Sequence, residues 1–534
     1  MSKQPWTSRA NSALKAWCAR RGLSRLSRQM LKRMLVDAVL VNLSLAVALF
    51  LRYLLASWVQ AGAFFVDRAL MDSFGEIFLK SAWLLTLLAL AIFYVSGFYT
   101  RGSMYISRYK ALVIFQAVSL SYLAFGSLVF LAGPGMGLPR SVLPMGWLLT
   151  LASLGGVRYA FILVEKEVLR DLGATRGSRV PDPLSVLVVG GAGYIGSVLV
   201  RDLLDRGWRV RVLDRLLYGE ESLSELYGRE GFELIEGDFR NVEAVVRAVQ
   251  GMGSIIHLGA VVGDPACELN GRFTFEVNLA ATRMIAEAGK GYGIRRFLFA
   301  SSCSVYGARD EKLDERAALA PLSLYSKTKI ESERLLLSLA SRDFSPILLR
   351  FATVCGLSYR PRFDLVVNLL AAQAALENKI TIYGGQQWRP FIHVQDVCLA
   401  LIRYLEAPLE VVGGEVFNVG SERGNLRLIE LGELMEKVMP GVEVSVRESA
   451  EDPRNYRVSF AKMEHAVGFS ASRSVEDAVR EIVEAVHSGR ISDYRRPEYS
   501  NVKWLTENGE TAITMVPNIY SVVMRTPEQV SAEG

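Results

Sequence analysis

A tyrosine and a lysine four positions apart, Tyr325 and Lys329, are the residues whose spacing first indicates chemistry. On a helix, positions i and i+4 share a face, so the phenol and the ammonium can point into one cleft. A tyrosine hydroxyl has a pKa of about 10, and a fixed cation beside it favours the phenolate. The pair therefore predicts a base that works near neutral pH. Because this spacing also occurs by chance, the interpretation depends on the motifs around it.

A glycine-rich turn stands between a short apolar run and a helical run, which is the order that a dinucleotide site needs. Residues 186–189 predict a buried strand, and residues 197–204 predict the helix. Glycines at the first, fourth and seventh positions allow a tight turn, and the helix N-terminus offers free N–H groups to a pyrophosphate. The turn residues that we expect to bind the cofactor are Gly190, Gly193, Tyr194, Ile195 and Gly196.

The strands that follow end in residues suited to the same cofactor. Asp214 closes the second strand, where an acid can accept hydrogen bonds from both adenine-ribose hydroxyls and would repel a 2′-phosphate, which favours NAD over NADP. Asp238 closes the third strand, where an adenine contact and a simple turn role are both open. After the structural His257, a small-residue turn should bring backbone close to the cofactor; it consists of Leu258, Gly259 and Ala260.

Hydroxyl and amide side chains complete the predicted site. Asn278 lies in a helical stretch and is expected to hold the geometry around the cofactor. A fifth strand breaks into hydroxyl residues, and Ser302 can hydrogen-bond the substrate oxygen that Tyr325 deprotonates. Cys303 has no base at a recognisable spacing and is expected to pack in the core.

Length and composition indicate two or more domains and a reducing compartment. A chain of 534 residues is too long for one ordinary domain. The 5 cysteines and 4 histidines are scattered, so the sequence predicts neither a disulfide framework nor a metal site.

The first third of the chain predicts a membrane region. Four apolar stretches approach the spanning length of roughly 20 residues, and they cover residues 35–55, 81–100, 111–132 and 141–164. The leader, residues 1–33, is basic and contains no acid, so it favours anionic lipid over nucleic acid as its partner. Basic residues follow the second and fourth stretches, and an acidic connection follows the first, which places both termini inside. We expect Asp37 and Arg158 to lie near the membrane interfaces.

The predicted domains then follow in order. Residues 34–168 form the transmembrane region, and residues 169–183, poor in apolar side chains, form a linker. Residues 184–490 form the nucleotide-binding domain with its substrate subdomain. For the polar tail, residues 491–534, the sequence predicts no role.

The ordered set of motifs resembles the extended short-chain dehydrogenase/reductase family, in particular the NAD-dependent epimerase/dehydratase group that acts on nucleotide sugars. Besides the residues above, it is carried by Val305-Tyr-Gly307, Leu349-Arg-Phe351, Arg389-Pro-Phe-Ile-His-Val-Gln-Asp396 and Phe417-Asn-Val-Gly420. The resemblance implies a Rossmann-type doubly wound parallel sheet with a smaller α/β substrate-binding subdomain. The membrane region is similar to that of bacterial polysaccharide-biosynthesis proteins, on residues 138–143 and 155–158.

The resemblance also implies roles for single residues. Ser302 matches the catalytic hydroxyl and Tyr325 the base. Lys329 matches the residue that lowers the tyrosine pKa and holds the nicotinamide ribose. Arg389 resembles the arginine that grips the substrate diphosphate, a task that Arg454 or its neighbour Arg457 would share. Thr353 stands where the family usually carries an asparagine, and we expect it to contact the substrate.

Two departures from the family patterns favour one reaction. Dehydratases of the group carry Asp-Glu directly after the catalytic hydroxyl, but this chain has Cys303-Ser304. Decarboxylases of UDP-glucuronate usually carry a Glu at the position of Ser304. The resulting hypothesis is an NAD-dependent epimerase, acting at C4 of a nucleoside-diphosphate sugar by transient oxidation to a keto sugar and hydride return.

Several alternatives stay open on the sequence. The enzyme could be a nucleotide-sugar reductase, dehydrogenase or dehydratase, or its substrate could be linked to a polyprenyl diphosphate. An alternative from outside the enzymes is a membrane-bound scaffold that senses NAD. The predicted location is a bacterial-type inner membrane, crossed several times, with the catalytic domain in the cytoplasm. The expected partners are the nucleotide sugar and membrane lipid, without nucleic acid, and homodimer formation is left open.

Overall fold

The computed structural model describes residues 28–61, 68–96, 108–131, 137–171, 182–448 and 454–513. The chain divides into two compact units, residues 1–174 and 175–534. Most of the basic leader, most of the predicted linker and the tail beyond residue 513 lie outside the described residues.

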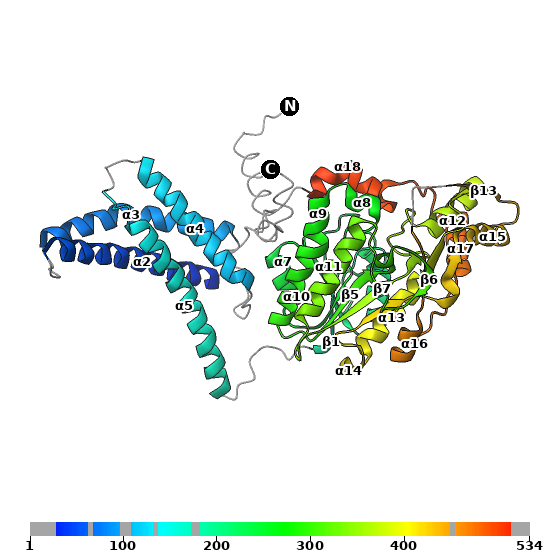
Figure 1. The fold of residues 1–534 in the computed structure, drawn as a ribbon, viewed down its shortest axis with the longest axis horizontal. Coiled ribbons are helices and arrows are strands. Elements are labelled where there is room, and N and C mark those ends of the chain that lie inside the picture. Colours follow the sequence, from blue (N-terminus) through cyan, green and yellow to red (C-terminus); the bar gives the residue numbers. More distant parts are fainter. Residues whose placement is uncertain are drawn as a thin grey trace, which may run out of the picture. The chain divides into compact units, whose positions relative to one another are not determined.

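In the first unit the described residues form four helices, which Figure 1 labels α2 (Arg28–Ala61), α3 (Arg68–Val95), α4 (Arg108–Leu131) and α5 (Val142–Asp171). Helices α3 and α5 each pack against both α2 and α4. Polar side chains pair between helices: the Asn42 amide donates to Thr86 Oγ1 at 2.7 Å, and the hydroxyls of Tyr122 and Thr150 are 2.8 Å apart. Such pairs satisfy polar groups where water is scarce.

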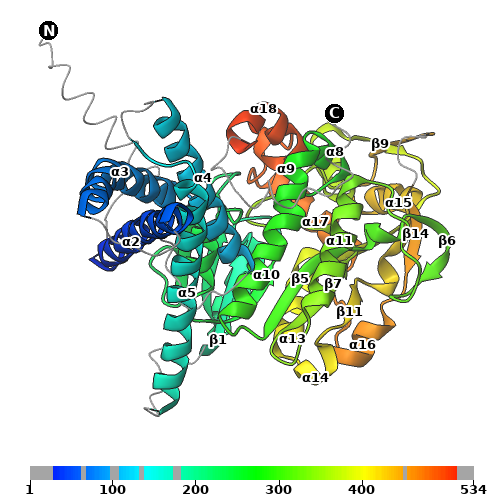
Figure 2. The same cartoon turned by 60° about the vertical axis from the view of Figure 1, so that its left-hand side comes forward.

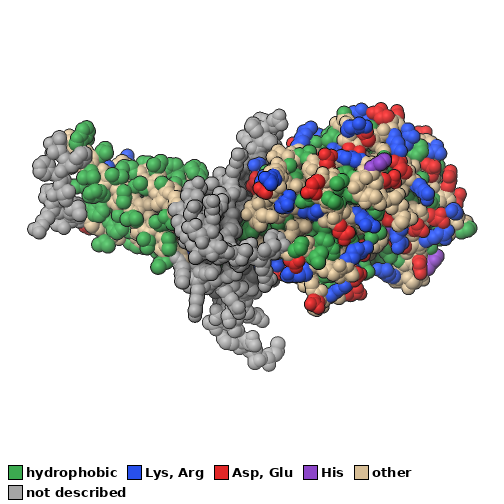
Figure 3. Space-filling model, turned by 90° about the horizontal axis from the view of Figure 1, so that it is seen from below, with side chains coloured by type: hydrophobic (Ala, Val, Ile, Leu, Met, Phe, Trp, Pro, Cys, Tyr) green, Lys and Arg blue, Asp and Glu red, His purple; other side chains and the backbone are tan. Residues whose placement is uncertain are grey.

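The outer surface of this unit is apolar. Large side chains point outward along its helices, with Leu35, Trp83, Leu123 and Leu148 all more than half exposed. Figure 3 shows the described part of this surface covered by hydrophobic side chains, whereas acidic and basic side chains alternate over the second unit. Three segments among the described residues are long and apolar enough to cross a membrane: Arg33–Val59, Phe74–Tyr94 and Ile114–Leu131. The described apolar part of α5, Val142–Val157, is shorter, so three of the four predicted spans meet these criteria.

One detail of the predicted membrane region needs correction. Helix α3 begins at Arg68, so Asp72 and Glu76 lie within a helix and not in a connection; Glu76 pairs with Lys80 one turn later at 2.6 Å. Asp37 is only 3% exposed and lies inside the helical unit; its position near a membrane interface stays a prediction. The side chain of Arg158 lies outside the described residues.

The second unit is built on a seven-stranded parallel sheet in the order β11-β7-β5-β4-β1-β2-β3. The strands are β1 (Asp182–Val189), β2 (Arg209–Asp214), β3 (Phe232–Glu236), β4 (Met252–His257), β5 (Arg296–Ser302), β7 (Ser345–Phe351) and β11 (Val416–Val419). The strand order reverses at β1, which lies between β2 and β4, so the carboxyl ends of β1 and β4 border the crevice of a doubly wound fold. The predicted Rossmann-type parallel sheet is confirmed.

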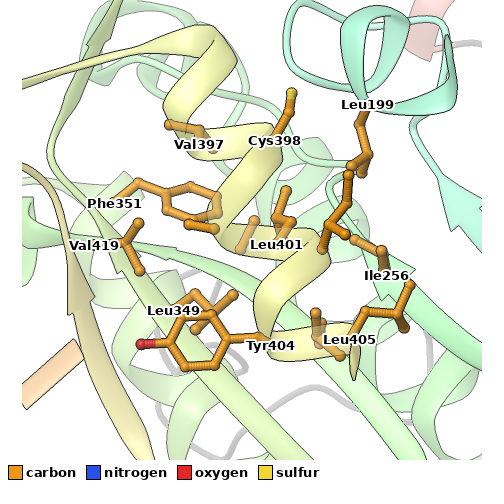
Figure 4. Packing of buried hydrophobic residues seen from close by; sticks show 14 of the residues in the cluster. Leu199, Ile256, Leu349, Phe351, Val397, Cys398, Leu401, Tyr404, Leu405 and Val419 are labelled. Carbon is orange, nitrogen blue, oxygen red and sulfur yellow. The ribbon is translucent and has the colours of Figure 1, made fainter. Parts of the chain in front are cut away.

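Helices cover both faces of this sheet (Figures 1 and 2). Helix α10 (Ala281–Gly291) packs beside α7 (Val242–Val249) and α11 (Leu324–Leu339), and α6 (Gly196–Asp205) packs beside α13 (Val394–Glu406). Figure 4 shows the core at α13, where apolar side chains meet those of the strands; its labelled members include Ile256, Leu349, Val397, Leu401, Tyr404, Leu405 and Val419.

Three small sheets form a second, smaller part of this unit. They pair β8 (Thr353–Cys355) and β12 (Asn425–Arg427) with β10 (Trp388–His393), β9 (Lys379–Tyr383) with β13 (Glu443–Arg447), and β6 (Ala308–Leu313) with β14 (Asn455–Val458). The helices α12 (Val366–Glu377), α15 (Leu428–Val438) and α17 (Val475–His487) pack together and share a core with β9. Short helices complete the unit: α8 (Asp264–Glu268), α9 (Gly271–Phe275), α14 (Leu409–Val412) and α16 (Ala461–Val467). The tail adds a helix that the sequence did not predict, α18 (Asn501–Ile513).

Candidate active site

The glycine turn joins β1 to α6 at one end of a cavity of about 820 Å³. Gly190 has φ +83°, and a Cβ on it would lie 2.7 Å from the backbone of Gly259. A Cβ on Gly196 would collide with the Gly190 carbonyl. Only glycine therefore fits at positions 190 and 196 of the turn. The five predicted residues Gly190, Gly193, Tyr194, Ile195 and Gly196 all line the cavity. This cradle fits a dinucleotide phosphate at the start of α6.

Asp214 stands at the end of β2 and also lines the cavity. Its carboxylate accepts hydrogen bonds from the backbone N–H groups of Ala192 at 3.0 Å and Leu216 at 2.9 Å, which fix it beside the turn. Burial raises the pKa of Asp214 above its usual value. An acid held at this strand end suits the ribose hydroxyls of a dinucleotide that lacks a 2′-phosphate.

Asp238 lies on the cavity wall after β3. Its carboxylate accepts three bonds from the Arg240 guanidinium, the shortest at 2.6 Å, and one from Arg215 at 3.4 Å. Burial alone would raise the pKa of Asp238, but the hydrogen bonds from Arg240 hold it below the usual value. The two predicted options, turn residue and cofactor contact, are compatible here, because the same residue bonds its neighbours and lines the cavity.

The turn after β4 presses against the end of β1. The backbone N–H groups of Leu258 and Gly259 both donate to the Val189 carbonyl at 2.9 Å. A Cβ on Gly259 would come within 2.7 Å of the Phe239 ring, so only glycine fits. Leu258, Gly259 and Ala260 all line the cavity, as the sequence predicts for a turn close to the cofactor.

Asn278 does not line the cavity but supports its wall. It is 2% exposed, and its amide accepts from the Val261 N–H at 2.8 Å and donates to the Val261 carbonyl at 3.0 Å. It also donates to Thr328 Oγ1 on α11 at 3.3 Å. This side chain therefore ties the cavity-lining Val261 to the helix that carries Tyr325.

Ser302, Tyr325 and Lys329 all line the cavity. Ser302 ends β5, and Tyr325 lies in the first turn of α11, which starts there because Ser323 and Ser326 form a capping box. Tyr325 hydrogen-bonds Ser302, and Lys329 Nζ lies 5.6 Å from the centre of the Tyr325 ring. The structure thus brings together three residues that are separate in the sequence.

The charges around Ser302, Tyr325 and Lys329 differ from the expectation that Lys329 lowers the pKa of Tyr325. Burial raises the pKa of Tyr325, and the groups that partly counter it are Arg362 and the hydrogen bond to Ser302. Lys329 Nζ donates to the Ala300 carbonyl at 2.6 Å, and burial lowers the pKa of Lys329 to about 8. The lysine is therefore held at the end of β5, below the tyrosine ring, instead of bonding the phenol.

The predicted substrate residues come from the smaller part of the unit, in or beside β8, β10 and β14. Thr353, Arg389 and Arg454 line it, whereas Arg457 does not. Arg389 is 5% exposed and donates to the Trp388 carbonyl at 2.9 Å and to the Arg454 carbonyl. Arg457 donates to the Asp310 carbonyl at 3.0 Å. Of the two predicted alternatives, Arg454 is the one in position to reach a ligand.

Cys303 and His257, to which the sequence assigned no catalytic role, are both buried and hydrogen-bonded. Cys303 is 1% exposed and its thiol donates to the Arg350 carbonyl at 3.2 Å; burial raises its pKa. His257 bonds Thr282 at 2.9 Å, and burial, with the nearby Lys329 charge, lowers its pKa to about 3. Both are unsuited to catalysis at neutral pH in these states.

Sequence reasoning missed two groups of cavity residues. One is the loop between β8 and α12, which contributes Arg360, Arg362 and Asp364. The other is α18, from which Asn501, Val502 and Leu505 line the cavity. Neither the two arginines nor the short, mixed sequence of α18 forms a motif that points to the site.

Comparisons with known proteins agree with this geometry. Residues 186–420 match the sequence model of the NAD dependent epimerase/dehydratase family. The UDP-glucose 4-epimerase of Bacillus subtilis (strain 168) is 30% identical over 324 residues, covering 55% of this chain and 94% of that protein. The dTDP-glucose 4,6-dehydratase of Xanthomonas campestris pv. campestris (strain B100) is 29% identical over 323 residues, covering 55% of this chain and 90% of that protein.

A solved structure aligns with the same part of the chain. The complex of MoeE5 with UDP-glucuronic acid and NAD has a TM-score of 0.51 and 29% sequence identity, and covers 57% of this chain and 99% of its own. The glycine turn, Asp214 and the turn after β4 provide the dinucleotide cradle that these matches require. On this evidence the chain belongs to the NAD-dependent epimerase/dehydratase family, with NAD as its cofactor.

Proposed function

We propose that the protein is a membrane-anchored epimerase that inverts C4 of a nucleoside-diphosphate sugar. The observation that carries the proposal is the meeting of Ser302, Tyr325 and Lys329 on the cavity wall without a carboxylate at positions 303 and 304. Relatives named as a UDP-glucose 4-epimerase and as a complex with UDP-glucuronic acid support a nucleotide sugar as the substrate.

In this proposal Tyr325 accepts the proton of the C4 hydroxyl, and Ser302 donates a hydrogen bond to the same oxygen. NAD⁺, when bound, supplies the reversible oxidation of the carbinol carbon. Lys329, fixed by the Ala300 carbonyl, holds the cofactor's nicotinamide ribose. Arg389 and Arg454 hold the diphosphate, so that the keto sugar can turn about its link to the nucleotide and present its other face. Tyr325 then returns the proton to the oxygen.

The carboxylates of the cavity argue against loss of water as the main reaction. Elimination needs an acid and a base beside the sugar, and the lining aspartates are Asp214, Asp238, Asp264 and Asp364. Asp214 accepts two backbone N–H bonds, and each of the other three is paired with an arginine at 3.3 Å or less. Ser304 instead lines the cavity with a buried hydroxyl that lacks a hydrogen-bond partner among the described residues, so it can bind a sugar hydroxyl.

The test is to incubate the purified protein with a panel of UDP- and dTDP-sugars without added NADH and to identify products by chromatography and mass spectrometry. A product of equal mass, inverted at C4, is expected. Loss of one water molecule would identify a dehydratase, and a requirement for added NADH would identify a reductase; either result would overturn the proposal.

The anchor is proposed to be four membrane spans, α2 to α5, with both termini in the cytoplasm of a bacterial-type cell. The exposed apolar side chains of all four helices support contact with lipid. Helix α5 has 30 residues, about 45 Å at ~1.5 Å per residue, which suffices to cross a bilayer. Only an even number of spans keeps the basic leader and the catalytic unit on one side.

The anchor raises the question of a lipid-linked substrate. We favour a soluble nucleotide sugar, with the anchor concentrating the enzyme beside glycan synthesis. Offering the same sugar on a nucleotide and on a polyprenyl diphosphate in detergent separates the two, because exclusive turnover of the lipid-linked sugar would overturn this choice. Formation of a homodimer stays a prediction.

A further inference from the structure

Helix α18 lies far beyond the family match, which ends at residue 420, yet it forms part of the cavity. Its first residue, Asn501, donates from its backbone N–H to Asp364 at 3.0 Å and from its side-chain amide to the Val262 carbonyl at 3.1 Å. Leu505 is 7% exposed and packs among the side chains around Tyr325. The Trp504 ring meets Tyr218 edge-on, with centres 5.3 Å apart. The helix is therefore built into the cavity wall.

Asn501 also holds an arginine. Arg360 Nη2 donates to the Asn501 side-chain oxygen at 2.9 Å, and the Arg360 guanidinium lies 3.8 Å from the centre of the Tyr218 ring. Arg360 is 6% exposed and lines the cavity. Its contacts on the protein side are thus an amide and an aromatic face, and both are uncharged.

Arg360 differs in this respect from its neighbour Arg362. Arg362 forms two bonds with the carboxylate of Asp364, at 2.8 and 2.9 Å. Arg360 makes no ion pair with any residue that the structure describes, and its Nε is buried without a hydrogen-bond partner there. Burial lowers the pKa of Arg360 to about 10, so it stays charged at neutral pH. Asp364 and Asp214 offset part of the cost of burying this charge, but neither forms an ion pair with Arg360. A bound anion in contact with the guanidinium would stabilise the buried charge further.

The position of Arg360 indicates which anion this is. Its partner Tyr218 follows Asp214 in the loop after β2, on the adenosine side of the predicted dinucleotide site. The cavity wall there also includes the glycine turn, which directs the start of α6 at a phosphate. The cofactor pyrophosphate is the anion that this part of the cavity receives, and a guanidinium pairs well with it.

We propose that Arg360 binds the NAD pyrophosphate and that α18 is a latch that holds Arg360 over the dinucleotide, so that NAD stays on the protein between turnovers. Retention suits a reaction in which the cofactor returns to its starting state in each cycle. The inference depends on NAD as the cofactor and is independent of which sugar reaction follows.

The experiment measures NAD on the full-length protein in detergent, without using turnover as the readout. NAD that co-purifies is quantified by chromatography after acid precipitation, and its dissociation rate is followed by exchange against isotopically labelled NAD. The variants are Arg360→Gln, Asn501→Ala and Trp504→Ala. Arg316→Gln, an arginine whose side chain is 92% exposed, is the matched control.

Loss of the charged partner in Arg360→Gln should speed NAD dissociation about 10- to 100-fold, the range for a charge-assisted bond. Asn501→Ala and Trp504→Ala remove only the latch and should speed dissociation by roughly 2- to 10-fold. The control should retain NAD as the parent protein does. If Arg360→Gln does not fold by circular dichroism, the two latch variants decide the question.

Unchanged NAD dissociation in the folded variants would overturn the proposal. If Arg360→Gln left NAD dissociation unchanged and raised the KM for the sugar nucleotide, the arginine would bind the substrate and the proposal would also be overturned. Failure of the epimerase proposal would appear instead in the identity of the product, with NAD retention unaffected.

Discussion

Tyr325 is the residue proposed to transfer the substrate proton, and its surroundings determine whether its phenol is ionised. Burial raises its pKa, while Arg362 and the Ser302 hydrogen bond oppose that shift. The phenol is therefore protonated at neutral pH until a ligand charge in the cavity changes the balance. Tyr325 can therefore act as the proposed base only when ligands occupy the cavity.

We predict that Tyr325→Phe lowers kcat by about 10²- to 10⁴-fold, because it removes the group that moves the C4 proton. The amount of bound NAD should change little, since the ring remains. Rapid-quench assays with the active sugar nucleotide measure the first quantity, and the nucleotide content of the purified variant measures the second. Tyr227→Phe, a tyrosine that is 46% exposed, is the control. Full turnover in Tyr325→Phe would contradict the assignment.

His257 provides a prediction on stability. Its pKa is about 3 in the folded protein against 6.5 for the free group, chiefly because of burial and secondarily because of Lys329. The unfolded chain therefore binds the proton first as pH falls, so the contribution is intact above pH 6.5 and is lost toward pH 3. Within that window the loss is about 1.4 kcal/mol per pH unit.

In His257→Asn the catalytic unit should be less stable at pH 7 and should lose less stability between pH 7 and 5 than the parent protein. Thermal unfolding of the NAD-free protein at several pH values measures the slope. His465→Asn, which removes a surface imidazole, is the matched control. Equal slopes in parent and His257→Asn would refute the prediction.

At the scale of elements, the site depends on how the turn after β4 is attached to α11. The capping box at Ser323 and Ser326 starts α11 one residue before Tyr325, which fixes where the phenol projects. Asn278 links that helix to Val261 through both backbone groups of the latter. Its neighbours Glu276 to Ala280 form a π-helical turn, a feature that is frequent at functional sites.

We expect Asn278→Ala to destabilise the catalytic unit by about 1–3 kcal/mol, because it leaves a buried Val261 N–H unpaired. NAD should also bind more weakly, since Val261 lines the cavity. Asn241→Ala removes an N-cap of α7 that accepts from Glu243 and Ala244, and should cost about 1 kcal/mol without affecting NAD. Thermal unfolding and NAD titration measure the two effects. Equal NAD affinity in both variants would remove Asn278 from the site.

At the scale of the whole molecule, two units of different surface chemistry share one chain. The first exposes leucine, valine and aromatic side chains along its helices, and the second exposes mixed charges (Figure 3). Apolar surface of this extent on a helical unit supports the proposed contact with lipid. In that proposal the number of spans decides on which side of the membrane the catalytic unit lies.

We predict that a fluorescent protein fused after Gly534 is fluorescent in a bacterial host and that alkaline phosphatase fused there is inactive, because the proposed topology places both termini inside. Alkaline phosphatase inserted between α2 and α3 should be active. The four-span arrangement would fail if the C-terminal phosphatase fusion were active, since that result requires an odd number of spans.

The sequence by itself determined the chemistry-bearing parts and their order. The glycine turn, Asp214, Ser302, Tyr325 and Lys329 follow from local patterns, because a strand, a turn and an i, i+4 helix pair are each encoded within a few residues. The parallel sheet followed from the same alternation of strands and helices. The apolar stretches followed from composition, although the start of α3 did not, because acidic residues are also compatible with a helix end.

Only the tertiary structure decided what meets at the cavity from distant parts of the chain. Arg360 is buried in the loop after β8, and the side-chain oxygen that it bonds comes from Asn501 on α18, about 140 positions later. Lys329 Nζ is held by the Ala300 carbonyl at the end of strand β5, a contact that the helical spacing of Tyr325 and Lys329 does not predict. The hydrogen bonds between Asn278 and Val261 are not predicted by any periodic pattern in the sequence. Burial and long-range pairing set these charges and bonds, and neither is a property of a short stretch of sequence.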